Sequence, residues 1–308
     1  MKIHEYKPNT KLDGERVIAL GFFDGVHIGH RRLIEKAISE AARKNAISSV
    51  FTFPAESGMP KNGTGRLYTT PEKLTIFENM GVDEVILADF ASVKDLSPES
   101  FVSDTLIGDL GCRIAISGRD FRFGSGAMGD SLLLEKIMNS DGREVCTEED
   151  VTLHSRKVST TAIKEYLTRG MIDEANEMLG AEYFIISEVG RGRGVGHTLG
   201  YPTLNTELYG KAEFLRPGVY CSSVEVGERR LPALTNVGSC PTFEPRPPHA
   251  ESFILDFGEE LYGSRVKIFL HSYIREERRF DSPEALTAQI KTDVEKAKEF
   301  FKHGRKLD

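Results

Sequence analysis

The spacing of apolar residues changes near residue 180, and this change restricts the fold more than any other feature of the sequence. Upstream of it, strand-like and helix-like segments alternate: Arg16–Phe22 is a short apolar run, and residues at helical spacing follow it at Leu33, Ile34, Ala37, Ile38, Ala41 and Ala42. Further strands are expected at Ile47–Phe53, Val85–Leu87 and Arg113–Ser117, and further helices at Pro71–Met80, after Ser97, and at Thr160–Leu179. This alternation predicts a parallel sheet covered by helices on both faces.

Downstream of residue 180, the apolar residues follow the two-residue period of strands. Five segments show this period without helices between them: Tyr183–Val189, Val219–Val226, Leu231–Val237, Glu251–Phe257 and Arg265–Ile274. In the last segment, one face is expected to be buried, namely Val266, Ile268 and Leu270. Short strands joined by glycine and proline turns favour a small closed barrel. A final helix is expected after Ser282 and Pro283, with one apolar stripe of Leu286, Ile290, Val294, Ala297 and Phe301.

The length agrees with two domains. At roughly 100–200 residues per domain, a chain of 308 residues suggests two. From the change of period near residue 180, we expect one domain over residues 1–181 and a second over residues 182–308. A single large α/β barrel is the alternative, but its second half would continue the strand–helix alternation.

The charge and the cysteines exclude several classes of protein. Forty basic and 47 acidic residues give a net charge of −7, which argues against a protein that coats nucleic-acid duplexes. No apolar run approaches the ~20 residues of a membrane span, and the first residues lack the apolar centre of a secretory signal. The four cysteines form no CxxC pair, since they lie far apart at Cys112, Cys146, Cys221 and Cys240. Neither a zinc site nor a disulfide framework is therefore indicated. We expect a cytoplasmic protein that binds neither nucleic acid nor membrane.

The sequence GFFDGVHIGH at residues 21–30 lies where the first strand meets the first helix, a place where parallel sheets bind ligands. Gly21 and Gly25 allow the backbone to approach a ligand, and a helix that starts near Gly29 offers N–H groups to a phosphate. The alternative is that the histidines only cap the helix. The chain contains neither a GxxxxGK[ST] loop nor a GxGxxG fingerprint. The HxGH element instead resembles that of the nucleotidylyltransferases; class I aminoacyl-tRNA synthetases share the element, but this chain has no KMSKS-like segment.

Two further segments narrow this resemblance: SGRDFRFG at 117–124 and VSTTAIKEYLTRG at 158–170. With GFFDGVHIGH, they resemble in order and spacing the adenylyltransferase module of bacterial bifunctional riboflavin kinase/FAD synthetases. The resemblance implies that His27 and His30 hold the phosphates of ATP as charge builds up, and that Asp120 and Phe123 lie near the flavin. The ATP-binding residues that it implies are Gly21, Phe22, Asp24, Gly25, Ser159, Thr160, Thr161 and Lys164.

The chain departs from the pattern of that family at three places. Lys164 replaces an arginine, which keeps the charge but loses the planar fork that binds phosphate with two hydrogen bonds. Ala127 stands where a second arginine is common, and the FxPxP segment reads FTFPAESG at Phe51–Gly58. These differences concern the fit of the flavin and the rate of turnover more than the reaction class. Apart from the resemblance, 117–124 is also compatible with a loop that packs its phenylalanines into the core, and 158–170 with an ordinary capped helix.

A second glycine-rich segment, GRGRGVGHTLGYPTLN, spans residues 190–205. Pro202 prevents it from opening a helix directly, which excludes a Rossmann-type loop. Glycines beside arginines suit a flap over phosphates, whereas a mobile turn between barrel strands is the alternative. Its end, PTLN, resembles the PTAN motif of riboflavin kinases, and a Thr hydroxyl and an Asn carbonyl are oxygen ligands suited to Mg²⁺. The resemblance assigns ATP to Gly192, Gly194, Gly196, Thr203 and Asn205, and the metal to the last two.

Glu251 shares strand parity with Phe253, Leu255 and Phe257, so its side chain is expected on the apolar side of the strand. Burial of a carboxylate favours proton uptake, which a general base needs. The riboflavin-kinase resemblance gives Glu251 that role towards the 5′-hydroxyl of riboflavin, and it places Arg275 near the flavin. The alternatives are a strand-end glutamate that faces water and an arginine on a solvated face.

Over residues 14–303, the resemblance implies an N-terminal α/β domain with a Rossmann-like nucleotidylyltransferase sheet, followed by a six-stranded antiparallel barrel with a terminal helix. The barrel would phosphorylate riboflavin with ATP, and the first domain would join AMP from a second ATP to FMN, forming FAD and pyrophosphate. Mg²⁺ is the expected metal, ATP, riboflavin and FMN are the expected substrates, and flavin-dependent apoproteins are expected acceptors of the products. Three alternatives remain: an enzyme with only one of the two activities, a flavin- or nucleotide-binding regulator, and an adenylyltransferase for another phosphorylated acceptor.

Overall fold

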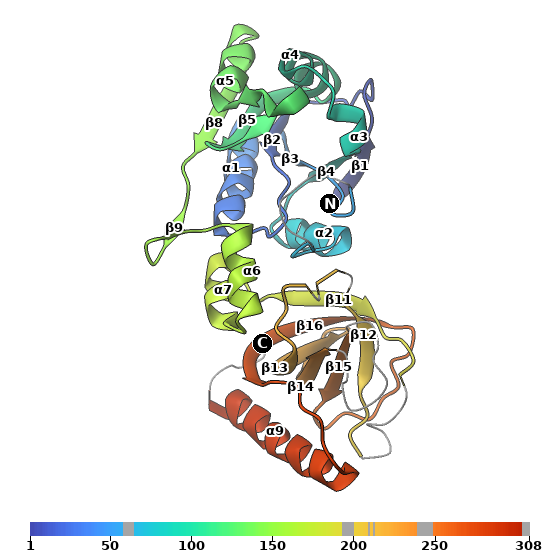
Figure 1. The fold of residues 1–308 in the computed structure, drawn as a ribbon. Helices are drawn as coiled ribbons and strands as arrows, with labels where there is room; N and C mark the ends of the chain where they lie inside the picture. The colour runs from blue at the N-terminus through green and yellow to red at the C-terminus, as the bar shows by residue number, and fades with distance from the viewer. Residues whose placement is uncertain (58–64, 193–199, 209, 212, 239–248, 304–308) are drawn as a thin grey trace. The chain divides into compact units, whose positions relative to one another are not determined.

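The computed structural model describes residues 1–57, 65–192, 200–208, 210–211, 213–238 and 249–303. The chain forms two compact units, one of Met1–Asn62 with Tyr68–Thr160 and one of Gly63–Leu67 with Thr161–Asp308 (Figure 1). The units divide at Thr160 because the two helices that follow it belong to the second unit. The division into functional domains 1–181 and 182–308 stays a prediction.

The first unit is built on a six-stranded parallel sheet, as the alternation predicts. The order of its strands is β1 (Lys2–Tyr6), β4 (Glu84–Ala88), β3 (Ile47–Thr52), β2 (Arg16–Leu20), β5 (Cys112–Gly118) and β8 (Glu144–Glu148), and neighbouring strands are parallel. The outer strands β1 and β8 are not expected from the sequence, because both are partly exposed and carry charged residues. All five residues of β2 are buried, which fits a strand covered on both faces.

Helices cover both faces of this sheet. On one face, Ile18 and Leu20 of β2 share a core with Phe101 and Leu134, which belong to the π-helix η1 (Phe101–Asp109) and to α5 (Ser131–Ser140). Because alternate residues of a strand point to opposite faces, Val17 and Ala19 point to the other one, where α1 (Ile28–Lys44) packs on β2 and β3. Helix α1 begins at Ile28, one residue before the predicted start near Gly29. The predicted helix start at Ser97 is confirmed, because the Ser97 side chain caps α4 (Pro98–Ser100) by accepting from the Ser100 N–H.

The remaining elements of the first unit are short. They are α2 (Thr70–Asn79), α3 (Phe90–Val93), the strand pair β6 (Arg122–Phe123) and β7 (Gly129–Asp130) with the 3₁₀ turn η2 (Ser125–Ala127) between them, and the pair β9 (Thr152–Leu153) and β10 (Arg156–Lys157). Helix α2 begins with a capping box formed by Thr69 and Glu72, so its position after β3 is well fixed.

The second unit starts with two helices, α6 (Thr160–Thr168) and α7 (Ile172–Leu179), where the sequence predicts one. The chain turns between them at Gly170, whose φ of 74° is left-handed. A Cβ at this position would lie 3.0 Å from the Tyr273 ring, so the turn also needs a residue without a side chain. Gly180 ends α7 in the left-handed conformation, as predicted.

A six-stranded antiparallel barrel follows, as predicted. Its strand order is β11 (Phe184–Glu188), β16 (Arg265–Arg275), β13 (Gly218–Val226), β14 (Arg229–Gly238), β15 (His249–Ile254) and β12 (Leu204–Glu207). A bridge between Gly190 and Asn205 connects the two outer strands and nearly closes the barrel. Strand β12 is not among the five expected segments; the PTLN motif runs directly into it.

Helix α9 (Pro283–His303) packs on the outside of the barrel, and its predicted cap is confirmed because the Ser282 hydroxyl accepts from the Ala285 N–H. Its Ala297 shares a core with Leu234 and Phe253 of β14 and β15. The prediction of one buried face on β16 is wrong at its second half, since Phe269 and His271 are buried as well. In the part of the chain that the structure describes, no helix has the length and apolar character needed to cross a membrane.

Candidate active sites in the two units

In the first unit, His27 and His30 stand together at the start of α1. His27 is the N-cap residue, and its Nδ1 accepts a hydrogen bond of 3.3 Å from the His30 N–H. Their rings are stacked, with centroids 3.6 Å apart and planes at 14°. His27 therefore caps the helix, and the same arrangement aligns both imidazoles at the positive end of the helix dipole, where phosphates bind favourably.

The loop before α1 has an unusual backbone. Phe23 and Val26 have positive φ values of 52° and 40°, which bulky and β-branched residues rarely adopt. A conformation of this kind persists where the surrounding structure enforces it, and it occurs often at ligand sites. Gly21 is expected to let the backbone approach a ligand; in the structure, a Cβ at Gly21 would lie 2.8 Å from the Phe23 ring, so the glycine makes room for that ring. Asp24 of the same loop is buried.

A cavity of about 940 Å³ opens beside this loop, at the carboxyl ends of β2, β3 and β5. The cavity brings together residues of two predicted motifs. Gly21, Phe22 and His30 come from GFFDGVHIGH, and Asp120 and Phe123 come from SGRDFRFG. Ligands of parallel sheets bind at this edge, so the cavity lies where the fold predicts it.

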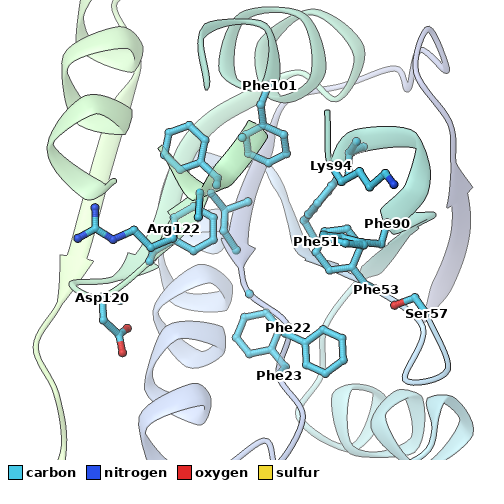
Figure 2. A pocket seen from close by; sticks show the side chains of 18 of the residues that line it. Phe22, Phe23, Phe51, Phe53, Ser57, Phe90, Lys94, Phe101, Asp120 and Arg122 are labelled. Atoms are coloured by element: carbon cyan, nitrogen blue, oxygen red, sulfur yellow. The ribbon is translucent and has the colours of Figure 1, made fainter. Parts of the chain in front are cut away.

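The wall of the cavity is mainly aromatic. Figure 2 shows the rings of Phe22, Phe23, Phe51, Phe53, Phe90 and Phe101 around it. Phe121 and Phe123 continue this wall, with ring centroids 5.5 Å apart and planes at 20°, and Phe123 also belongs to the core. The loop thus packs its phenylalanines into the core and lines the cavity with them, so the two interpretations of SGRDFRFG are compatible. A planar aromatic ligand fits such a wall.

Charged groups lie at the rim of the cavity. Asp120 and Arg122 lie on one side in Figure 2, and Lys94 lies on the other. The Lys157 Nζ lies 3.3 Å from Asp120 Oδ2, and the Arg122 guanidinium lies 3.4 Å from Asp130. Ala127, which replaces a common arginine of the family, also lines the cavity, where it adds no charge.

The motif VSTTAIKEYLTRG at residues 158–170 is divided between the units. Ser159 and Thr160 belong to the first unit, and Thr161 and Lys164 to the second. The Lys164 Nζ donates to the Gly65 carbonyl at 2.8 Å and lies 5.5 Å from the centroid of the Phe214 ring. Its role in binding ATP stays a prediction.

Lys73 is a residue of the first site that motif reasoning does not find. It lies on α2, and its side chain is only 1% exposed. Its Nζ donates to the carbonyls of Phe22 and Phe53 at 2.7 and 2.9 Å, and to Thr52 Oγ1 at 3.0 Å. No motif contains it, and the sequence shows only a lysine within the helix expected at Pro71–Met80.

In the second unit, the strand register brings predicted site residues into one row. Asn205 of β12 pairs with Glu251 of β15, and Glu251 pairs with Asn236 of β14. Directly paired residues point to the same face of a sheet, so the two amides flank the carboxylate. Thr203 precedes β12, and the Asn205 amide donates to its carbonyl at 3.4 Å.

Glu251 lies on the outer face of the barrel. The barrel interior takes Ala250, Ser252 and Ile254, all of which are buried, whereas Glu251 shares the face of Phe253, which α9 covers. The predicted parity with Phe253 is therefore correct, but the Glu251 side chain keeps 30% exposure and lies 3.0 Å from His249 Nε2. The predicted strand start at Glu251 is also two residues late, since β15 begins at His249.

Residues from the end of β16 extend this row. The Arg275 guanidinium binds Asp293 of α9, with Nε and NH2 at 2.9 and 2.8 Å from Oδ2. Both side chains are largely buried, so Arg275 is not on a solvated face. Asn236 donates to Glu277 at 3.0 Å, and a Cβ at Gly238 would overlap the Glu277 carboxylate. Neither Asn236 nor Glu277 is a predicted site residue, because their proximity depends on the strand register.

The glycine-rich segment is described only in part. A Cβ at Gly192 would overlap the Asn205 side chain, so this glycine allows the backbone to pass directly over the amide. Gly194 and Gly196 lie outside the described residues. Thr203 and Asn205, the two predicted metal ligands, carry hard oxygen donors, which fit Mg²⁺ and not a soft metal.

A buried polar cluster lies elsewhere in the second unit. Glu182 accepts from Arg230 at 2.6 Å and contacts His271 Nδ1 at 3.2 Å, and His271 Nε2 lies 2.9 Å from Ser223 Oγ. Burial raises the pKa of Glu182, but the hydrogen bonds from His271 and Arg230 and their charges outweigh it and lower this pKa to about 2. Ser223 and His271 are fully buried, whereas Arg230 and Glu182 are partly exposed, so the cluster ties the barrel interior to its surface.

Comparison with known proteins finds a family match for each half of the chain. Residues 9–162 match the family model described as FAD synthetase, and residues 179–301 match the one described as riboflavin kinase. The bifunctional riboflavin kinase/FMN adenylyltransferase of Bacillus subtilis (strain 168) is 33% identical over 316 residues, which cover 99% of either chain. The protein of the same description from Escherichia coli (strain K12) is 34% identical and covers 92% of either chain.

A solved structure shares the fold of nearly the whole chain. It is described as a macrolide-efflux protein from Streptococcus pneumoniae, is 28% identical in sequence, and aligns with a TM-score of 0.84 over 97% of this chain and 99% of its own.

Proposed function

The chain belongs to the family of bifunctional riboflavin kinase/FMN adenylyltransferases, and on that premise we propose that each unit carries one active site. The protein phosphorylates riboflavin with ATP to give FMN, and it transfers AMP from a second ATP to FMN to give FAD and pyrophosphate. Because both family models match, an enzyme with a single activity and a pure binding protein are not supported.

In the first unit, the aromatic cavity binds FMN, and the start of α1 binds ATP. The observation that carries this assignment is that one cavity joins His30 of the first motif to Asp120 and Phe123 of the second. An oxygen of the FMN phosphate attacks the α-phosphorus of ATP, and pyrophosphate leaves; no covalent enzyme intermediate is needed. His27 and His30 hold the phosphates while negative charge builds up, assisted by the helix dipole.

In the second unit, the row of Asn205, Glu251 and Asn236 forms the kinase site. Glu251 takes the proton of the ribityl 5′-hydroxyl, the oxygen attacks the γ-phosphorus of ATP, and ADP leaves. Thr203 and Asn205 hold Mg²⁺, which when bound neutralises charge on the ATP phosphates. Arg275, which Asp293 orients, lies near the flavin, and Gly192 lets the backbone cover the phosphates.

One experiment tests both assignments. Purified protein is incubated with riboflavin, ATP and Mg²⁺, and the flavins are separated by chromatography over time. FMN is expected first and FAD later, with one ADP for each FMN and one pyrophosphate for each FAD. Absence of FMN would contradict the kinase assignment, and failure to convert added FMN to FAD would contradict the adenylyltransferase assignment.

The location of the protein and the acceptors of its products form a separate part of the proposal. Dependence on ATP supports the cytoplasm as the compartment, and FMN and FAD are then passed to flavin-dependent apoproteins. Cell fractionation that recovers the protein with membranes would contradict this location, and the transfer of new FAD to an added apoprotein is measurable as reconstituted activity of that apoprotein.

A further inference from the structure

Lys73 connects the backbone of two cavity walls through a single ammonium group. Its Nζ lies 2.7 Å from the Phe22 carbonyl, 2.9 Å from the Phe53 carbonyl and 3.0 Å from Thr52 Oγ1. An ammonium has three N–H donors, and three acceptors lie within hydrogen-bond distance of this one. Thr52 Oγ1 itself donates to the Phe22 carbonyl at 2.9 Å, which closes a small network among the three residues.

The two carbonyls belong to neighbouring chain segments, which this network holds at a fixed spacing. Phe22 follows β2, and Phe53 follows the neighbouring parallel strand β3. Beyond these strands, the side chains of Phe22 and Phe53 line the cavity (Figure 2). Lys73 therefore sets the distance between the Phe22 and Phe53 backbones where the cavity begins.

The same contact fixes the orientation of a strained peptide. The C=O and N–H of a trans peptide point in opposite directions, so a Phe22 carbonyl directed at Lys73 also fixes the direction of the Phe23 N–H. Phe23 has a φ of 52°, and its ring and that of Phe22 both line the cavity. The Lys73 Nζ also lies 4.7 Å from the centroid of the Phe22 ring, within the range of a cation–π contact.

Stability alone does not account for a lysine at this position. Burial of an ammonium in a 1% exposed side chain carries a desolvation penalty, whereas a hydrophobic residue on α2 would pack without it. Helix α2 is already fixed by its own capping box, in which Glu72 accepts from the Thr69 N–H at 2.7 Å. The polar network thus serves the loop carbonyls.

We propose that Lys73 is a positioning residue for adenylyl transfer, which holds the Phe22 and Phe53 walls at the spacing that the flavin ring needs. This inference rests on the proposed function of the first unit. Lys73 touches no reacting atom; it acts through the aromatic side chains whose backbone it holds.

The test uses Lys73→Met in the full chain, since methionine fills a similar volume but donates no hydrogen bond. With FMN and ATP as substrates, the KM for FMN is expected to rise about tenfold, while the KM for ATP and the rate of riboflavin phosphorylation stay within about twofold. Thr52→Val is expected to raise the KM for FMN by a smaller factor, because it leaves the Lys73 bonds to the two carbonyls in place. Lys136→Met, at an exposed position of α5, is the matched control and should change nothing.

The outcomes separate the inference from the proposed function. If the wild type converts FMN to FAD and both Lys73→Met and Thr52→Val leave the KM for FMN unchanged, the positioning role is wrong. If the variants lose both activities together, Lys73 only supports the fold, and the role is again wrong. If the wild type itself makes no FAD from FMN, the proposed function of the first unit fails, whatever the variants do.

Discussion

The imidazole rings of His27 and His30 are stacked at the start of α1, with centroids 3.6 Å apart. The Nδ1 of His27 accepts from the backbone of His30, so one ring caps the helix while it supports the other. His30 reaches the cavity that also contains Asp120 and Phe123. Each histidine thus supports the position of the other, so under the proposed function the loss of either is expected to weaken phosphate binding.

The His30→Ala variant should lose FAD formation and keep FMN formation. Removal of one donor that stabilises charge in a transition state typically costs about a hundredfold or more in rate. The kinase site belongs to the second unit, so FMN formation from riboflavin should stay within about twofold. Separate assays with FMN and with riboflavin, each with ATP and Mg²⁺, measure the two rates. If a folded His30→Ala protein lost both, the two sites would not be separate.

The Glu251→Gln variant should show the opposite pattern. Glutamine keeps the shape of the side chain and its place between Asn205 and Asn236, but it accepts no proton. General-base catalysis contributes about 10²–10⁴ in rate, so riboflavin phosphorylation should fall by that factor while FAD formation from added FMN continues. Retention of the kinase rate would remove Glu251 from the mechanism.

The order of elements in both units could be predicted from the sequence, because apolar periodicity reports burial directly. The parallel sheet, helix α1 and the antiparallel barrel all have this origin, whereas the helix start at Pro98 is predicted from its Ser97 cap. Among the elements that escaped prediction, β1 and β8 are partly exposed, and β12 has only four residues. Helix α5 also escaped prediction, although its buried Leu134 and Met138 show helical spacing. The single helix expected over 160–179 is broken because the left-handed Gly170 packs against Tyr273, a contact between residues distant in sequence.

The candidate sites were predictable where a motif is local and not where they depend on register. His27, His30, Asp120 and Phe123 lie in short segments with recognisable patterns. Asn236 joins Glu251 only because β14 pairs with β15 in a particular register, and Arg275 meets Asp293 only because α9 returns over the barrel. Pairings of this kind are set by the packing of the whole unit.

The Lys164→Arg variant tests the assignment of the motif at residues 158–170. Lys164 holds the Gly65 carbonyl with a hydrogen bond of 2.8 Å, and an arginine restores the residue usual in the family while it keeps a donor. We expect adenylyl transfer to stay unchanged or to increase, because a planar guanidinium binds phosphate with two hydrogen bonds. Initial rates of pyrophosphate release from FMN and ATP measure this. A sharp decrease would show that residues 158–170 do not correspond to the family's motif.

The Glu182 cluster predicts how the second unit responds to acid. Burial raises the pKa of Glu182, but His271 and Arg230 lower it to about 2 in the folded protein, from an ordinary value of 4.5. A carboxyl whose pKa is lower in the folded state stabilises the fold above its unfolded pKa. This contribution is therefore complete above pH 4.5 and is lost as the pH falls from 4.5 towards 2.

Scanning calorimetry of the full chain should show a lower unfolding temperature for Glu182→Gln than for the wild type at pH 7, and the difference should shrink as the pH falls from 4.5 towards 2. The control is Glu188→Gln on β11, an exposed position whose substitution should leave the unfolding temperature unchanged at every pH. A difference between Glu182→Gln and the wild type that stays constant down to pH 2 would mean that the ion pairs with His271 and Arg230 do not stabilise the barrel.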